Sequence, residues 1–117
     1  MTMTLVSTLY GTDMELYYDE TFRAVLEDHL QLLRSDKGSV IEPVSPQIAW
    51  RYRNDFYSLL REGFNVAPHL HWLIMRLSGY DSPMDVDQDL TFIVFPSESR
   101  LAQIANNHLT TYKLSSQ

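Results

Sequence analysis

One stretch in the second half of the chain constrains the fold more than any other. Residues 71–79 read HWLIMRLSG, in which aliphatic side chains recur at helical spacing before a glycine, the residue that commonly ends a helix. A polar loop over residues 81–89 follows, and it leads into the apolar run LTFIVF at residues 90–95 and then a proline. An apolar run of this length, bounded by turn residues, indicates a strand that is covered on both sides. The stretch therefore predicts a helix that begins near Pro68, a loop and a buried strand.

The preceding residues predict a second helix and a partner for this strand. Residues 40–44 form a short extended run around Pro43, which cannot donate to a ladder and so favours an edge strand. Ser45 and Pro46 then mark a helix start, because serine caps the first turn and proline is tolerated at the first helical position. We expect this helix to occupy residues 46–62 and to end at the following glycine.

Further helices are predicted on either side of these elements. Asp19 is placed to cap an amphipathic helix that runs to about Arg34, and residues 35–38 supply its stop. Residues 99–112 have apolar side chains at helical spacing and predict a last short helix. Residues 1–18 show no clear period, and the pattern leaves open whether they form a strand or an extended arm on a partner.

Composition excludes several classes of function. At 117 residues, the chain is long enough for one domain with a hydrophobic core. It has no cysteine, which excludes disulfides, thiol nucleophiles and cysteine-based zinc sites and fits a reducing compartment. Its net charge of −6 repels phosphate backbones, so we expect no nucleic-acid binding. Because neither a signal peptide nor a long apolar run is evident, we expect a soluble chain that does not contact a membrane.

No group of residues has the spacing of a catalytic or metal site. His69 and His71 point in nearly opposite directions from a helix, and we interpret them as ordinary, partly exposed histidines. The alternating aspartates of residues 85–89 begin like a calcium loop, but they lack its glycine and its final glutamate. No serine has a nucleophile-elbow context, and no carboxylate lies in an apolar segment that would raise its pKa. We therefore expect no enzyme activity, no metal and no cofactor.

Aromatic and apolar residues suggest where the chain contacts a partner. We interpret Trp50 and Trp72 as core residues, whereas the candidate tyrosines suit an interface rim, where one end of the ring is apolar and the other wet. The N-terminal arm is apolar at many positions, so we expect it to order on a partner subunit. The candidate partner-contact residues are Leu5, Leu9, Tyr10, Tyr17, Tyr57, Tyr80 and Asp81.

Residues 40–96 resemble a lysin-motif (LysM) unit. The first helix carries part of that family's "S-I-A-x-x-Y" pattern, at Ile48, Ala49 and Tyr52. The second half is similar to the family's second helix, "D-P" loop and closing strand, although Ser78 stands where asparagine is usual and no "G-D-T-L" opening precedes the first helix. The second-half positions that carry the resemblance are Trp72, Ile74, Ser78, Gly79, Asp81, Pro83, Leu90 and Pro96.

Among lysin-motif-like proteins, the chain is similar in size and in its "H-W-x-I-M-x-L-S-G" run to the small baseplate wedge family of contractile phage tails. The resemblance implies an α+β fold in which a strand-helix-helix-strand unit has a two-stranded antiparallel sheet with both helices on one face. With the flanking elements read from the sequence itself, we expect an N-terminal arm over residues 1–18, a flanking helix over 19–38, the LysM-like core over 39–97, and a C-terminal helix and tail over 98–117.

The resemblance further implies a function. In that family the unit is an assembly part of the baseplate, present in several copies in a symmetric virion structure and in contact with other tail proteins. We expect the chain to assemble in the host cytoplasm, to reside in the virion tail and to have no catalytic activity. Two alternatives remain open: a carbohydrate- or peptidoglycan-binding LysM module, and an intracellular adaptor or toxin-neutralising protein that uses its acidic surface.

Overall fold

The computed structural model describes residues 14–115, and in this range it contains six α-helices and one two-stranded antiparallel sheet. This is the α+β content that the sequence predicts. The chain divides into two compact units, one built from residues 14–39 and 96–115 and the other from Val40–Phe95. No helix within the described range is long and apolar enough to cross a bilayer.

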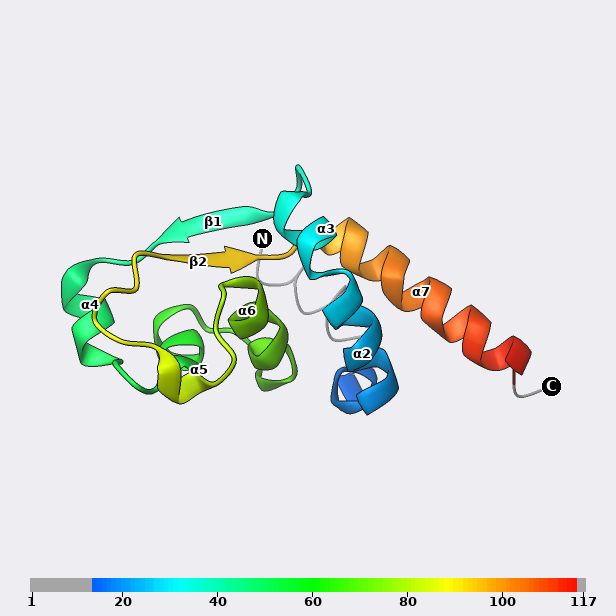
Figure 1. The fold of residues 1–117 in the computed structure, drawn as a ribbon, viewed down its shortest axis with the longest axis horizontal. Coiled ribbons are helices and arrows are strands. Elements are labelled where there is room, and N and C mark those ends of the chain that lie inside the picture. The colour runs from blue at the N-terminus through cyan, green and yellow to red at the C-terminus, as the bar shows by residue number, and fades with distance from the viewer. Residues whose placement is uncertain (1–13, 116–117) are drawn as a thin grey trace. The chain divides into compact units, whose positions relative to one another are not determined.

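The first unit consists of helices only (Figure 1). Its core joins α2 (Glu20–Asp28) to α7 (Glu98–Ser115) through the buried Phe22, whose ring lies 5.1 Å from that of His108. Tyr17 packs edge-on against Phe22 at 5.4 Å between centroids, and it is only 4% exposed. The elements of this unit are η1 (Met14–Tyr18), α2 (Glu20–Asp28), α3 (Leu30–Ser35) and α7 (Glu98–Ser115).

The helix expected from Asp19 to Arg34 is divided in two at His29. Asp19 caps α2 as predicted, because its carboxylate accepts a hydrogen bond from the Thr21 N–H at 3.0 Å. At His29, however, the ring Nδ1 bonds the Val25 carbonyl at 2.7 Å, which is the acceptor that the His29 backbone N–H would use in a continuous helix. The His29 N–H donates instead to the Leu26 carbonyl at 3.0 Å, and α2 ends at this point.

The second unit contains the sheet and the remaining helices. Its core includes Phe56, Leu60, Ile74 and Ile93, each at most 1% exposed. The elements of this unit are β1 (Val40–Pro43), α4 (Pro46–Arg51), α5 (Phe56–Ser58), the π-helical turn η2 (Leu59–Gly63), η3 (Pro68–Leu70), α6 (His71–Leu77), η4 (Pro83–Asp85) and β2 (Phe92–Phe95).

The prediction of a single helix over residues 46–62 is also wrong. Ser45 caps its first turn as predicted, but α4 ends at Arg51, and Asn54 then adopts a left-handed backbone with φ of 62°. Asparagine tolerates this conformation better than most residues. A new helix starts at once, because Asp55 caps α5 through the Ser58 N–H at 3.3 Å. The later helix agrees better with its prediction, since α6 ends at Leu77 and Gly79 follows with φ of +99°.

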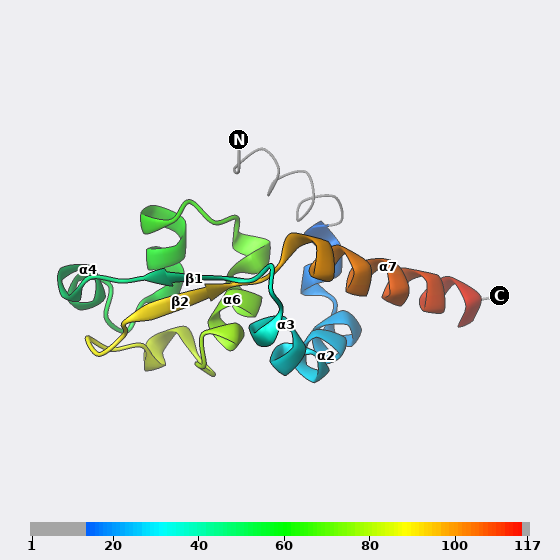
Figure 2. The ribbon, with the colours of Figure 1, turned by 90° about the horizontal axis from the view of Figure 1, so that it is seen from above.

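The two strands pair in antiparallel register, with Ile41 opposite Val94 and Pro43 opposite Phe92. They run side by side in Figure 1 and overlap in the view from above (Figure 2). Helix α6 packs against β2, and β1 lies on the far side of β2 from α6 (Figure 1). The consecutive residues Ile93 and Val94 are both buried, so β2 is covered on both faces, as predicted.

Candidate protein-interaction surface

Strand β1 is exposed along its whole length. All four of its residues are exposed, and its two aliphatic side chains, Val40 and Ile41, are 49% and 64% accessible. An aliphatic side chain in water forgoes the stabilisation that burial gives, and strands of folded domains normally bury at least one face. The unit therefore presents an apolar strand that its own core does not use.

The backbone of β1 also has a hydrogen-bonding edge with which no other described strand pairs. The Val44 N–H donates to the Thr91 carbonyl at 2.9 Å, which fixes the phase of the antiparallel ladder. Because alternate residues turn their polar groups to opposite sides, Val40 and Glu42 face β2, whereas Ile41 and Pro43 face away from it. Pro43 has no N–H, so this outer edge offers one donor, at Ile41, and two carbonyl acceptors.

The opposite edge of the sheet is closed by a side chain. The Val94 N–H, which points away from β1, donates to the Oγ of Ser78 at 3.1 Å. Ser78 is the residue that caps the end of α6, so helix and strand are joined at this point. In the sequence, Ser78 stands out only as a departure from the usual asparagine, and no local signal predicts its bond to a strand 16 residues later. Among residues 14–115, the result is a sheet with one open edge, on β1.

Two further aromatic residues of this unit are exposed. Phe92, the partner of Pro43 in the sheet, is 45% accessible. Trp50 is 55% accessible, so the prediction that it belongs to the core is wrong. The break after α4 accounts for this, because Arg53 turns back and places its guanidinium 3.8 Å from the Trp50 ring centroid while donating to the Trp50 carbonyl. Trp72, the other predicted core tryptophan, is half-buried.

The predicted contact residues within this unit lie at different places on its surface. Tyr57 and Tyr80 are half-buried; the ring of the first lies tilted against His71 with centroids 5.3 Å apart, and that of the second lies tilted against Phe56 at 5.9 Å. Burial, reinforced by the charges of nearby aspartates, raises the pKa of Tyr80. Asp81 is 86% accessible and pairs with Arg76. Because both tyrosine rings make contacts inside the unit, only their remaining exposed parts are available to a partner.

Of the predicted contact residues in the N-terminal arm, one lies within the described residues and three do not. Tyr17 lies in the core of the first unit, so its assignment to a free arm is corrected: the amphipathic ring packs on Phe22 and does not face solvent. Leu5, Leu9 and Tyr10 lie outside the described residues, and their predicted contacts remain a prediction.

The two histidines of the H-x-H pair are buried, which corrects the expectation that they are partly exposed. His69 and His71 are 5% and 6% accessible. The Nε2 of His71 lies 2.8 Å from the Val66 carbonyl oxygen. Because this oxygen can only accept a hydrogen bond, Nε2 must carry the ring proton. Burial lowers the pKa of His71 most, and electrostatic interactions with Arg61 and His69 lower it further, against the opposing effect of the Val66 bond. His71 is therefore held as a neutral, structural donor.

The alternating aspartates form a local turn. The Asp87 carboxylate accepts a hydrogen bond from the Asp89 N–H at 2.9 Å, an interaction that orders the entry to β2. Within residues 14–115, no three histidine or acidic side chains converge as metal ligands would.

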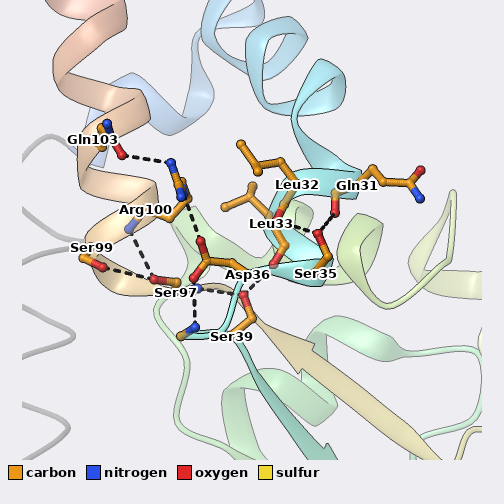
Figure 3. Close-up of polar contacts among 11 residues, drawn as sticks. Gln31, Leu32, Leu33, Ser35, Asp36, Ser39, Ser97, Ser99, Arg100 and Gln103 are labelled. Carbon is orange, nitrogen blue, oxygen red and sulfur yellow. Dashed lines mark hydrogen bonds and ion pairs between the residues drawn. The ribbon is translucent and has the colours of Figure 1, made fainter.

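The first unit contains a connected polar network at the start of α7 (Figure 3). Arg100 Nε donates to Asp36 at 2.9 Å, and this hydrogen bond is the main cause of the lowered pKa of Asp36. The Oγ of Ser97 accepts a hydrogen bond from the Arg100 N–H. The Ser97 N–H donates to the Oγ of Ser39 at 3.1 Å. Gly38 completes the contact, since a side chain there would come within 2.7 Å of the Ser97 hydroxyl.

This network borders a shallow depression of about 500 Å³. Its best-placed charged groups, Asp36 and Arg100, satisfy each other, and Arg100 also donates to Gln103 at 3.1 Å. We therefore assign the network to holding the end of α3 against the start of α7. The depression is lined by Leu32, Ser35, Asp36, Lys37, Ser99, Arg100 and Gln103.

Comparisons with protein-family models, with curated proteins and with solved structures gave no match for this chain.

Proposed function

We propose that the chain is a structural component of a phage tail baseplate that acts through protein–protein contacts and not through catalysis. The observation that carries the proposal is the exposed apolar strand β1 with its open edge. An exposed strand edge promotes aggregation of an isolated protein, whereas in an assembly it can pair with a neighbouring chain. The polar contacts of the described residues support the same view. Those of Asp19, Ser45 and Asp55 cap helices, and that of Ser78 joins α6 to β2.

The order of elements in the second unit adds support. Within Val40–Phe95, a strand is followed by helical segments and by an antiparallel partner strand. This order is the one expected of a LysM-like unit, and the resemblance of residues 40–96 to the small baseplate wedge family links it to assembly in a virion. We propose that the chain occurs there in several copies and contacts other tail proteins.

A genetic experiment tests this proposal. A stop codon early in the gene should give particles without complete tails, and supplying the chain in trans should restore them. The expected phenotype is an assembly block, visible by electron microscopy as heads without attached tails. Normal, infectious tails produced without the chain would contradict the proposal.

A carbohydrate-binding LysM module is the second candidate, and one observation favours it. The exposed Trp50 is the type of amphipathic ring that sugar-binding surfaces use. One face of this ring is occupied by Arg53, however, which leaves less of it for a sugar. The two candidates are separated by the glycan titration described in the Discussion.

A further inference from the structure

We infer that the open edge of β1 is an acceptor for an extended segment of another protein, which adds to the sheet as a third, antiparallel strand. This mode of binding uses backbone hydrogen bonds for affinity and alternate side chains for specificity. The inference rests on the proposed function only in taking the partner to be a protein.

The arrangement of donors and acceptors on this edge defines what the partner must supply. Ile41 presents an N–H and a carbonyl, and Pro43 presents a carbonyl alone. A partner strand therefore needs two backbone N–H groups, two residues apart, and one carbonyl. Neither of the two partner residues opposite Ile41 and Pro43 can be proline.

A second copy of β1 is a poor partner for the same edge. The two-fold register that pairs Ile41 of each copy with Pro43 of the other lacks two of its four hydrogen bonds, because each proline has no N–H to give. The same register places Glu42 directly opposite Glu42 of the other copy, and like charges at opposed positions destabilise a sheet. Both features disfavour self-pairing in this register, so we take the occupant to be a different segment.

The side chains of β1 define the sequence pattern of that segment. Ile41 and Pro43 lie on one face of the sheet together with Phe92, so the partner residues opposite them should be apolar and cover this face. Glu42 lies on the other face and is exposed, so the residue opposite it should be lysine or arginine. The expected pattern is apolar–basic–apolar, and a basic segment also suits a chain whose net charge is −6.

A selection from a display library of random ten-residue peptides on the full chain tests the inference. Enriched peptides should contain the apolar–basic–apolar pattern. In synthetic copies, N-methylation of the two apolar residues should weaken binding at least about tenfold, because two hydrogen bonds of about 1 kcal/mol each are lost. N-methylation of the central basic residue should leave binding unchanged, since its N–H points away from β1.

Charge reversal on the protein supplies an independent readout. Glu42→Lys should shift the selected pattern from a basic to an acidic central residue, whereas Glu20→Lys, a matched reversal at an exposed position in α2, should leave the pattern as it is. Binding of a selected peptide should also slow hydrogen exchange at the Ile41 amide.

Two results would overturn the inference. One is a selection that enriches no pattern. The other is a set of peptides that tolerate N-methylation at every position and bind Glu42→Lys as well as the original chain. Either result refutes the proposal that β1 accepts a partner strand, but it does not contradict the baseplate proposal. Conversely, normal tails formed without the chain refute the baseplate proposal and do not affect the peptide result.

Discussion

His71 shows how one buried side chain makes the stability of its unit depend on pH. Its ring is almost inaccessible, lies tilted against that of Tyr57 and uses Nε2 to donate to the Val66 carbonyl. A second proton would place a charge in this apolar setting, next to Arg61 and His69, so burial and electrostatic interactions lower the pKa of His71 below 6.5 in the folded chain. The unfolded chain keeps the ordinary value and takes up the proton first.

The expected consequence is a loss of stability in mild acid. The contribution of His71 is complete above pH 6.5, and it is lost as the pH falls from that value toward the lower pKa of the folded chain. Urea unfolding between pH 7.5 and pH 5 measures this loss. In His71→Gln the amide retains a donor for Val66 but does not titrate, so its stability should fall less over the same range. Equal losses in the two proteins would show that His71 is not responsible.

Two aromatic residues only six positions apart should respond very differently to truncation. Phe56 is fully buried, and Phe56→Ala should lower the free energy of unfolding by about 3–5 kcal/mol through lost burial and the cavity left behind. Trp50 is exposed and contacts Arg53, so Trp50→Ala should cost about 1 kcal/mol or less. Chemical denaturation of both variants tests the pair. A large loss for Trp50→Ala would mean that this residue does belong to the core.

Strand β1 has two features that oppose its self-association. Pro43 removes a donor from the open edge, and Glu42 would face itself in a two-fold pair. The double variant Glu42→Thr/Pro43→Val restores the donor and removes the charge, so it should self-associate more strongly than the original chain. Sedimentation velocity over a concentration series measures the difference. An unchanged sedimentation coefficient would indicate that this edge is not available for pairing.

The elements themselves differ in how far the sequence predicts them. Strong local signals were sufficient for the caps at Asp19 and Ser45, the glycine after α6 and the apolar strand β2. The breaks at His29 and Asn54 were missed because apolar spacing continues through both. What ends each helix there is a side-chain bond or a backbone rotation, and neither changes the hydrophobic pattern.

The candidate surface was predicted less well than the fold. Pro43 correctly marked β1 as an edge strand, but aliphatic residues in a strand usually indicate burial, so the exposure of Ile41 was not foreseen. The tyrosines were selected because their rings suit interface rims, and Tyr17 shows that the same property suits a core. Whether an amphipathic ring faces inward or outward depends on contacts between distant segments, which a single sequence does not contain.

At the scale of the whole molecule, a glycan titration separates the two candidate functions. The chain lacks the opening loop of glycan-binding LysM units, and Arg53 covers one face of its exposed tryptophan. We therefore expect no measurable heat of binding when chitin oligomers or peptidoglycan fragments are titrated into the chain. A Kd below about 1 mM, or roughly −4 kcal/mol, would favour the carbohydrate-binding module over the assembly protein.

The most direct test of the baseplate assignment is quantitative mass spectrometry of purified tailed particles and of baseplates isolated from them. A structural component should remain with the baseplate through purification, in a fixed number of copies per tail that matches the symmetry of the assembly. We predict that peptides of this chain are present at such a constant ratio to the other baseplate proteins. Their absence from purified particles, in samples where the free chain is abundant in the infected cell, would contradict the account.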